Sequence, residues 1–206
     1  LPIIEPILAQ YGIPRDFRFV PLAESELMND CVSPKGAAGF WQFMPQTARD
    51  YGLAVGPTVD ERNNLRQSTI AACKYLRDLY RELGSWTLVA AAYNSGVGHV
   101  QGRMASQGHG NYYKLRLHAE TNQYLFRILA YKELLTNPRK YRKLLPPRAV
   151  AQLTRPLPAA LRGKPNADVP AFWAAAPLWG PRAVESLLEA PSALEKWFWS
   201  ALNPAD

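Results

Sequence analysis

The segment from Trp86 to Tyr93 is almost entirely apolar, and it constrains the fold of this chain more than any other feature. Its residues read Trp-Thr-Leu-Val-Ala-Ala-Ala-Tyr, so a helix built from them has no face suited to water. Such a helix is stable only when other elements surround it. The sequence therefore predicts a central helix that the rest of the domain encloses.

Apolar residues recur at helical spacing in several other segments, and no segment shows the alternation typical of a strand. The fold class we predict is therefore all-α. Gly and Pro residues mark most of the expected ends. The predicted helices are residues 3–11, a segment from Pro14 that ends by Ser33-Pro34, residues 46–51, a long helix that Gly84 closes, Trp86–Tyr93, and residues 119–135. We expect residues 53–63 to be irregular and residues 99–117 to form a loop.

Glu24 is the residue of most chemical interest in the second of these segments. At helical spacing it shares a stripe with Val20, Leu27 and Met28, where an apolar side chain is normally buried. An acid on such a stripe either finds a partner or keeps its proton, because burial penalises the charged form and raises the pKa. A carboxylic acid that is protonated near neutral pH suits general acid catalysis, although a salt-bridged or solvated Glu fits this pattern equally well.

Two turn-rich segments have a composition that suits a binding cleft. Residues 33–45 combine two glycines with Phe40, Trp41 and Phe43, so the backbone can approach a ligand beside an aromatic wall. The predicted central helix ends at Tyr93-Asn94-Ser95-Gly96, which would present a Tyr and an Asn at a sharp turn. Each segment taken alone fits a plain connection or a helix cap as well.

Four motifs, in this order, resemble the lytic transglycosylase catalytic domain of glycoside hydrolase family 23, which is lysozyme-like (goose-type). The resemblance covers roughly residues 1–140. Ser33 and Gln42 follow Glu24 by nine and eighteen residues, as the family pattern expects. The matching residues are Glu24-Ser25, Gly39-Phe40-Trp41-Gln42 with Met44, Ala92-Tyr93-Asn94-Ser95-Gly96, and Glu120-Thr121 with Tyr124.

The resemblance implies that the chain cleaves the bond between N-acetylmuramic acid and N-acetylglucosamine in bacterial peptidoglycan. Glu24 would act first as general acid and then as base on the muramyl C6 hydroxyl, giving a 1,6-anhydro product. Tyr93 would hydrogen-bond or orient Glu24 and the sugar, and Ser33, Gln42 and Glu120 would bind polar groups of the substrate. The resemblance further implies that Met44 and Tyr124 line the groove and that Asn94 serves either the substrate or the turn. It implies no cofactor.

Two alternatives stay open at this point. One is a hydrolytic lysozyme, which would want a second acid to activate water. The sequence candidates for that acid are Glu26, Asp30, Asp60 and Glu61. The other is a non-catalytic wall-binding module that has kept the fold.

The net charge of +7 favours an anionic partner such as the carboxylates of peptidoglycan. We do not expect nucleic-acid binding, because the basic residues are scattered and no recognition motif is present. A metal site is not expected either, because the chain has only three His and no close Cys/His spacing. Cys31 and Cys73 are predicted to be two buried thiols, with one disulfide as the alternative.

The composition changes after Tyr141. Ten of the 18 prolines and four of the six tryptophans lie in residues 142–206. We therefore predict a catalytic domain at 1–141 and a Pro/Trp-rich extension at 142–206 that packs on it, with short helices at 182–189 and 192–202. We expect a monomer in the periplasm or cell envelope, with membrane or wall association through this extension or through a segment upstream of Leu1. No signal peptide is visible at Leu1, as in a mature, trimmed or cytoplasmic chain.

Overall fold

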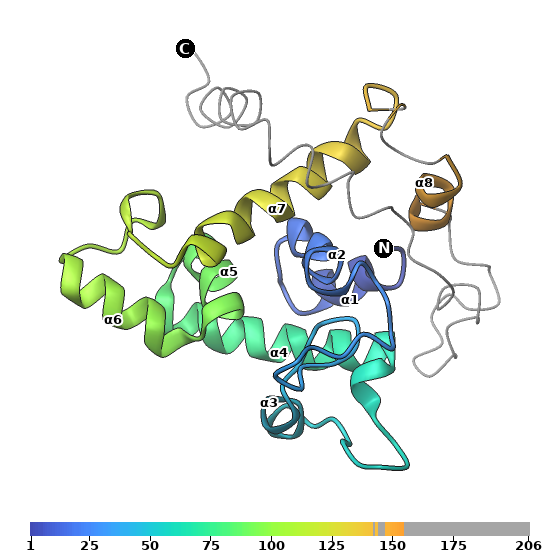
Figure 1. Cartoon of the computed structure of the whole chain (residues 1–206), viewed down its shortest axis with the longest axis horizontal. Helices are drawn as coiled ribbons and strands as arrows, with labels where there is room; N and C mark the ends of the chain where they lie inside the picture. The colour runs from blue at the N-terminus through green and yellow to red at the C-terminus, as the bar shows by residue number, and fades with distance from the viewer. Residues whose placement is uncertain (142, 144–146, 155–206) are drawn as a thin grey trace.

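The computed structural model describes residues 1–141, 143 and 147–154. Within these ranges the secondary structure is helical apart from three isolated β-bridges, which confirms the all-α prediction. Figure 1 shows the arrangement of the helices. In chain order the elements are α1 (Ile4–Gln10), η1 (Arg15–Phe19), α2 (Val20–Ser25), α3 (Pro45–Asp50), η2 (Glu61–Asn63), α4 (Leu65–Leu83), α5 (Trp86–Ser95), α6 (Val97–Gln107), η3 (Tyr112–Lys114), α7 (Ala119–Thr136) and α8 (Pro147–Thr154).

Helix α5 is the centre of the fold, as its apolar sequence predicts. It packs against α4, α6 and α7 (Figure 1), and its residues 88–92 are all buried. Burying a side chain such as Leu88 or Val89 contributes about 1.5–3 kcal/mol each relative to leaving it in water. The helix ends where Gly96 adopts a φ of +87°, a conformation that favours glycine.

Helices α4 and α7 also confirm the sequence prediction. The Asn64 side chain accepts hydrogen bonds from the backbone N–H groups of Arg66 and Gln67 and so caps the start of α4. Gly84, with a φ of +65°, ends the same helix. Helix α7 runs one residue beyond the predicted 119–135 and buries Tyr124 and Ile128.

Helix α2 is much shorter than predicted, so the expected stripe does not continue through Leu27 and Met28. The helix ends at Ser25 because Glu26 and Leu27 adopt left-handed backbone angles, with φ of +53° and +61°. Glu24 therefore lies in the last turn of a six-residue helix instead of the middle of a long one.

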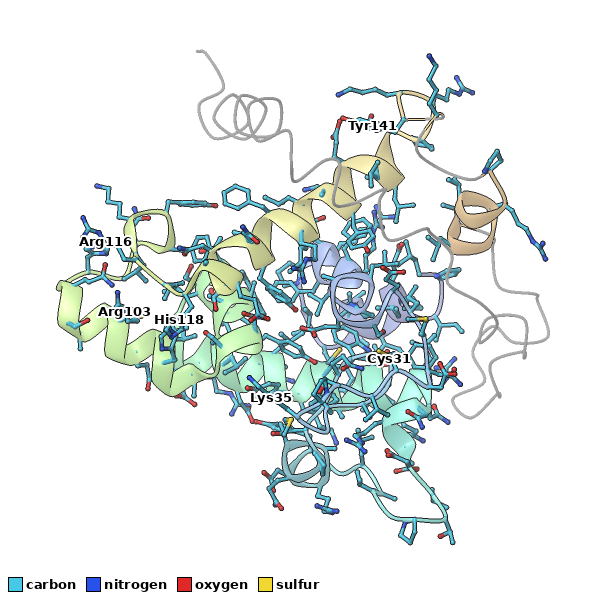
Figure 2. The ribbon with its side chains drawn as sticks, viewed as in Figure 1. Cys31, Lys35, Arg103, Arg116, His118 and Tyr141 are labelled. Atoms are coloured by element: carbon cyan, nitrogen blue, oxygen red, sulfur yellow. The ribbon has the colours of Figure 1, made fainter. Side chains whose placement is uncertain are left out.

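The expectation of a loop at residues 99–117 was wrong, because residues 97–107 form α6. Val100 is the buried residue of this helix, and most of its other side chains are polar, so the sequence shows no strong apolar stripe. Tertiary contacts stabilise it instead. His99 stacks on His118 with ring centroids 4.4 Å apart, and the Arg103 Nε donates to the carbonyl of Arg116 at 2.7 Å. Figure 2 shows Arg103, Arg116 and His118 gathered between α6 and the start of α7.

A buried arginine organises the loops on either side of α3. Arg62 donates to both carboxylate oxygens of Asp60, and its Nη1 donates to the carbonyls of Gly36 at 2.8 Å and Phe43 at 3.0 Å. Its charge is neutralised by Asp60, so the buried group meets the usual requirement for a paired charge. Arg62 therefore fixes the segment that carries the Gly39-Phe40-Trp41-Gln42 motif.

In the C-terminal extension the structure describes residue 143 and residues 147–154, and the latter form α8, a helix that the sequence analysis did not predict. Its Leu153 is buried and belongs to the same core cluster as α1 and α7 residues. The predicted helices at 182–189 and 192–202 lie outside the described residues. In the described part of the chain, no helix is both long and apolar enough to cross a membrane. Cys31 and Cys73 are free thiols, and Cys73 alone of the two is buried.

The contact between Gly39 and Arg62 generates a stability prediction. A Cβ on Gly39 would lie 2.0 Å from the Arg62 carbonyl oxygen, and Gly39 has a φ of +76°. We expect Gly39→Ala to lower the free energy of unfolding by more than about 3 kcal/mol, because backbone strain and a clash with backbone add together.

Gly36→Ala is the matched control. Gly36 has a φ of +85° but no atom within 4 Å of the added Cβ, so strain alone costs it about 1–2 kcal/mol. Urea unfolding measures both, and equal losses would contradict the account.

Candidate active site

Glu24 lies at the contact between α2 and α7. Its side chain remains partly accessible, and the Tyr124 hydroxyl of α7 donates a hydrogen bond to its Oε1. Tyr124 is itself only 1% exposed, so this hydrogen bond forms in a region from which water is largely excluded. The shortness of α2 matters here, because a helix that ends at Ser25 presents Glu24 in its final turn.

The pKa of Glu24 is raised to about 7, chiefly because the carboxyl group is surrounded by protein atoms and loses hydration. The hydrogen bond from Tyr124 and the positive charge of Arg127 oppose this shift, since both favour the carboxylate. The negative charge of Glu120 raises the pKa of Glu24 by a smaller amount. The group thus holds a proton near neutral pH, and two neighbours stabilise the carboxylate once that proton has left.

Ser25 connects α2 to the Gly39-Phe40-Trp41-Gln42 segment. Its hydroxyl donates to the carbonyl of Phe40 at 2.9 Å and also lies 3.2 Å from the carbonyl of Pro21. The residue that follows the acid therefore braces the end of its helix against the loop.

Gln42 and Ser33 stabilise turns of that loop. Gln42 has a φ of +49°, and its side-chain amide donates to the carbonyls of Cys31 at 3.0 Å and Gly39 at 2.9 Å. The Ser33 hydroxyl accepts a hydrogen bond from the Ala37 backbone at 3.0 Å. Figure 2 shows Cys31 and Lys35 on this segment. Both polar residues thus have structural partners, and each keeps further hydrogen-bonding capacity.

Tyr93 and Asn94, at the end of α5, tie the motifs together. The Tyr93 hydroxyl donates to the carbonyl of Trp41 at 2.8 Å, and the Asn94 Oδ1 accepts from the Thr121 hydroxyl at 3.0 Å. Burial and the nearby charge of Glu24 raise the pKa of Tyr93, which places this ring close to the acid. The third motif is therefore bonded to the second through Tyr93 and to the fourth through Asn94.

The two tyrosines have different contacts. We expected Tyr93 to hydrogen-bond or orient Glu24 and the sugar; its hydroxyl donates to Trp41, and the hydrogen bond to Glu24 comes from Tyr124. Because Tyr124 is buried, it offers almost no surface to line a groove. The remaining two residues of the predicted site are accessible: Met44, at the start of α3, is 43% exposed, and Glu120 is exposed in the first turn of α7. Which tyrosine hydroxyl reaches Glu24 depends on how α5 and α7 are rotated about their axes relative to α2. The spacing of residues along the sequence does not determine that rotation.

Arg127 is a residue that the sequence reasoning missed. It lies on α7 three residues after Tyr124, so both occupy the face that meets α2. It forms no hydrogen bond or ion pair with any described residue, and its positive charge partly offsets the rise that burial causes in the pKa of both Glu24 and Tyr124. The sequence could have indicated Arg127, because Glu120, Tyr124 and Arg127 are spaced so that they share one face of a helix.

The four candidates for a second acid are not equivalent. Asp60 is paired with Arg62, and the Glu61 side chain accepts a hydrogen bond from the Ala54 backbone at 2.7 Å. Asp30 is exposed in a turn. Glu26 lies directly after α2, and burial together with the charge of Glu26 raises the pKa of Tyr131, further along α7. Among the described residues, no group of three or more His, Cys, Asp or Glu side chains is arranged to hold a metal ion.

Comparison with known proteins links this geometry to a family. The model of the transglycosylase SLT domain matches residues 2–116. Membrane-bound lytic murein transglycosylase D of Escherichia coli strain K12 is 34% identical over 140 residues, which is 66% of this chain and 31% of that protein; the protein of the same name from E. coli O6:H1 matches equally. A putative tributyltin chloride resistance protein of Alteromonas sp. strain M-1 is 33% identical over 90 residues, 43% of this chain and 44% of that protein. The chain thus spans about a third of the transglycosylases it matches.

The raised pKa of Glu24 predicts a pH-dependent effect of Glu24→Gln on stability. Between the ordinary value of 4.5 and about 7, the unfolded chain ionises this residue while the folded chain retains the proton. The wild-type free energy of unfolding therefore falls by about 1.4 kcal/mol per pH unit in this window, whereas the variant lacks this contribution. In urea unfolding, the free energy of unfolding of the variant relative to that of the wild type should rise by on the order of 3 kcal/mol from pH 4 to pH 8, with a plateau above pH 7. A difference independent of pH would contradict the shifted pKa.

Proposed function

Because the chain belongs to the transglycosylase SLT domain family, we propose that it is a lytic transglycosylase that cleaves bacterial peptidoglycan. The bond cleaved joins N-acetylmuramic acid to N-acetylglucosamine, and the product ends in 1,6-anhydro-muramic acid. The observation that carries the proposal is the environment of Glu24, a partly accessible acid with a pKa of about 7 that is hydrogen-bonded by Tyr124. One group with that pKa can serve as acid and then as base near neutral pH.

In the first step the protonated Glu24 transfers its proton to the glycosidic oxygen. The bond from the muramyl C1 to that oxygen breaks, and the N-acetylglucosamine side leaves with a free hydroxyl. Negative charge develops on Glu24 as the proton leaves. The Tyr124 hydroxyl and the Arg127 guanidinium stabilise the carboxylate form of Glu24, so both lower the free energy of this step.

In the second step the carboxylate of Glu24 removes the proton from the muramyl C6 hydroxyl. The C6 oxygen attacks C1 and forms the 1,6-anhydro ring, and Glu24 is protonated again for the next cycle. This sequence needs no water molecule and no second catalytic carboxylate, in contrast to most two-carboxylate glycosidases. Two of the four candidates for a second acid are engaged elsewhere, Asp60 with Arg62 and Glu61 with the Ala54 backbone, which supports this reading over a hydrolase.

The surrounding polar residues supply the groups that a glycan needs. Glu120 forms no hydrogen bond or ion pair with the rest of the described chain, so its carboxylate is free to accept from sugar hydroxyl or amide groups. We assign sugar and N-acetyl contacts to the remaining capacity of Gln42, Ser33 and Asn94, and apolar contact to Met44. Tyr93 would position the sugar at the cleavage point, while Tyr124 would act on Glu24.

The proposed setting follows from the substrate. Peptidoglycan lies in the cell envelope, and the net charge of +7 suits its peptide carboxylates. The relatives from E. coli are named as membrane-bound proteins. We propose a monomeric catalytic domain at residues 1–141 that acts in the periplasm, with any outer-membrane or wall attachment supplied by other parts of the protein.

Digestion of purified peptidoglycan tests the proposed reaction. Mass spectrometry of the wild-type digest should show 1,6-anhydro-muramic ends, and Glu24→Gln should reduce the cleavage rate by roughly a thousandfold while binding to the wall persists. Asp30→Asn is the matched control, because it neutralises an exposed carboxylate that the mechanism does not use. Reducing-end muramic acid without anhydro products would establish a hydrolase. Cleavage that survives Glu24→Gln would refute the assignment of the acid, and binding without cleavage by the wild type would indicate a wall-binding module.

A further inference from the structure

A surface cavity of about 470 Å³ is lined by residues at the end of α3 and in the C-terminal half of α4, apart from the contact between α2 and α7 that holds Glu24. Its volume is within the range of pockets that bind small ligands. Tyr51 contributes an aromatic ring, and Lys74, Arg77 and Arg81 contribute positive charge from successive turns of α4. None of the residues that line this cavity belongs to the motifs that carry the proposed catalytic function.

The acidic side chains that line this cavity have partners within the protein, whereas two of its basic side chains have none among the described residues. Asp78 accepts a hydrogen bond from the Tyr51 hydroxyl at 3.1 Å and pairs with Arg81 at 2.8 Å. Asp50 accepts from the Gln46 amide on its own helix. Lys74 and Arg77, in contrast, are exposed and form no hydrogen bond or ion pair with any described residue. The acids therefore have partners within the protein, and two cations remain available to an anionic ligand.

A row of aromatic rings connects this cavity with the candidate active site. The Tyr51 ring lies 5.1 Å from the Tyr75 ring, and the Tyr75 ring lies 5.5 Å from the Tyr93 ring, centroid to centroid. Each of the three keeps part of its surface accessible. Burial and, after it, the nearby charge of Glu24 raise the pKa of Tyr93, so two ring contacts separate the cavity from the immediate surroundings of the acid.

We propose that this cavity is a second binding site for the same glycan strand, at a distance from the bond that is cleaved. There Lys74 and Arg77 bind the carboxylates of a peptide substituent, and the Tyr51 ring packs against the strand. A polymer that occupies Glu24 and continues along the row of tyrosines would bring its neighbouring peptides to these two cations. The inference rests on the proposed function, because it takes the glycan strand as the ligand.

The size of the effect follows from the exposure of the two cations. An exposed ion pair changes affinity by no more than about fivefold, and salt weakens it further. We therefore expect Lys74→Gln/Arg77→Gln to raise KM for peptide-bearing strands by roughly five- to tenfold at low salt, with kcat unchanged. On strands of equal length from which an amidase has removed the peptides, the variant and the wild type should have the same KM.

Lys114→Gln/Arg116→Gln is the matched control. It removes the same charge from exposed positions on the segment between α6 and α7, where Figure 2 labels Arg116, and should leave KM unchanged on both substrates. Thermal unfolding of all three proteins checks that they are folded. Equal KM for both strands in the wild type, a loss on stripped strands as large as on peptide-bearing strands, or an equal loss in the control would each overturn the proposal.

Anionic lipid vesicles give the remaining comparison. If Lys74→Gln/Arg77→Gln abolishes vesicle binding and leaves KM for peptide-bearing strands unchanged, the cations bind a membrane surface and the inference is wrong. The proposed function has its own readout, since the anhydro ends of the wild-type products do not depend on these two residues. A digest without such ends would refute the reaction regardless of the behaviour of the double variant.

Discussion

The contact between Glu24 and Tyr124 is the interaction on which the rest of the site depends. A carboxyl group that is largely desolvated costs free energy when it ionises, and here one buried hydroxyl and one nearby guanidinium reduce that cost without removing it. The resulting pKa of about 7 is a compromise between burial and partners. If either side of this balance were stronger, the group would be fixed as an acid or as a carboxylate, and one step of the proposed cycle would fail.

The fold maintains this balance by bonding the four motifs to one another. Ser25 is bonded to the carbonyl of Phe40, Tyr93 to that of Trp41, and Asn94 to Thr121. Helix α5 lies between α4, α6 and α7 and so fixes the positions of these contacts in a tightly packed interior. A substitution that destabilises the loop at Gly39 or Arg62 would therefore also disturb the position of Glu24, because Ser25 is bonded to that loop.

Sequence reasoning succeeded where one segment determines its own structure. The apolar helix at 86–93, the stop at Gly84 and the helix from Ala119 all follow from local composition. The early end of α2 could not be predicted in the same way, because non-glycine residues adopt its left-handed angles and a distant carbonyl braces Ser25. Helix α6 was missed because tertiary contacts hold a largely polar segment. The hydrogen bond from Tyr124 to Glu24 and the position of Arg127 depend on how α2 and α7 pack against each other.

The central claim is that Glu24 has a pKa near 7 in the folded protein, and a carboxyl titration measures this most directly. In protein labelled with carbon-13 at Glu side-chain carboxyl groups, the resonance that disappears in Glu24→Gln identifies Glu24. Its chemical shift should titrate with a midpoint of about 7. A midpoint close to the ordinary value of 4.5 would show that the group is ionised at neutral pH, and would contradict its role as the general acid.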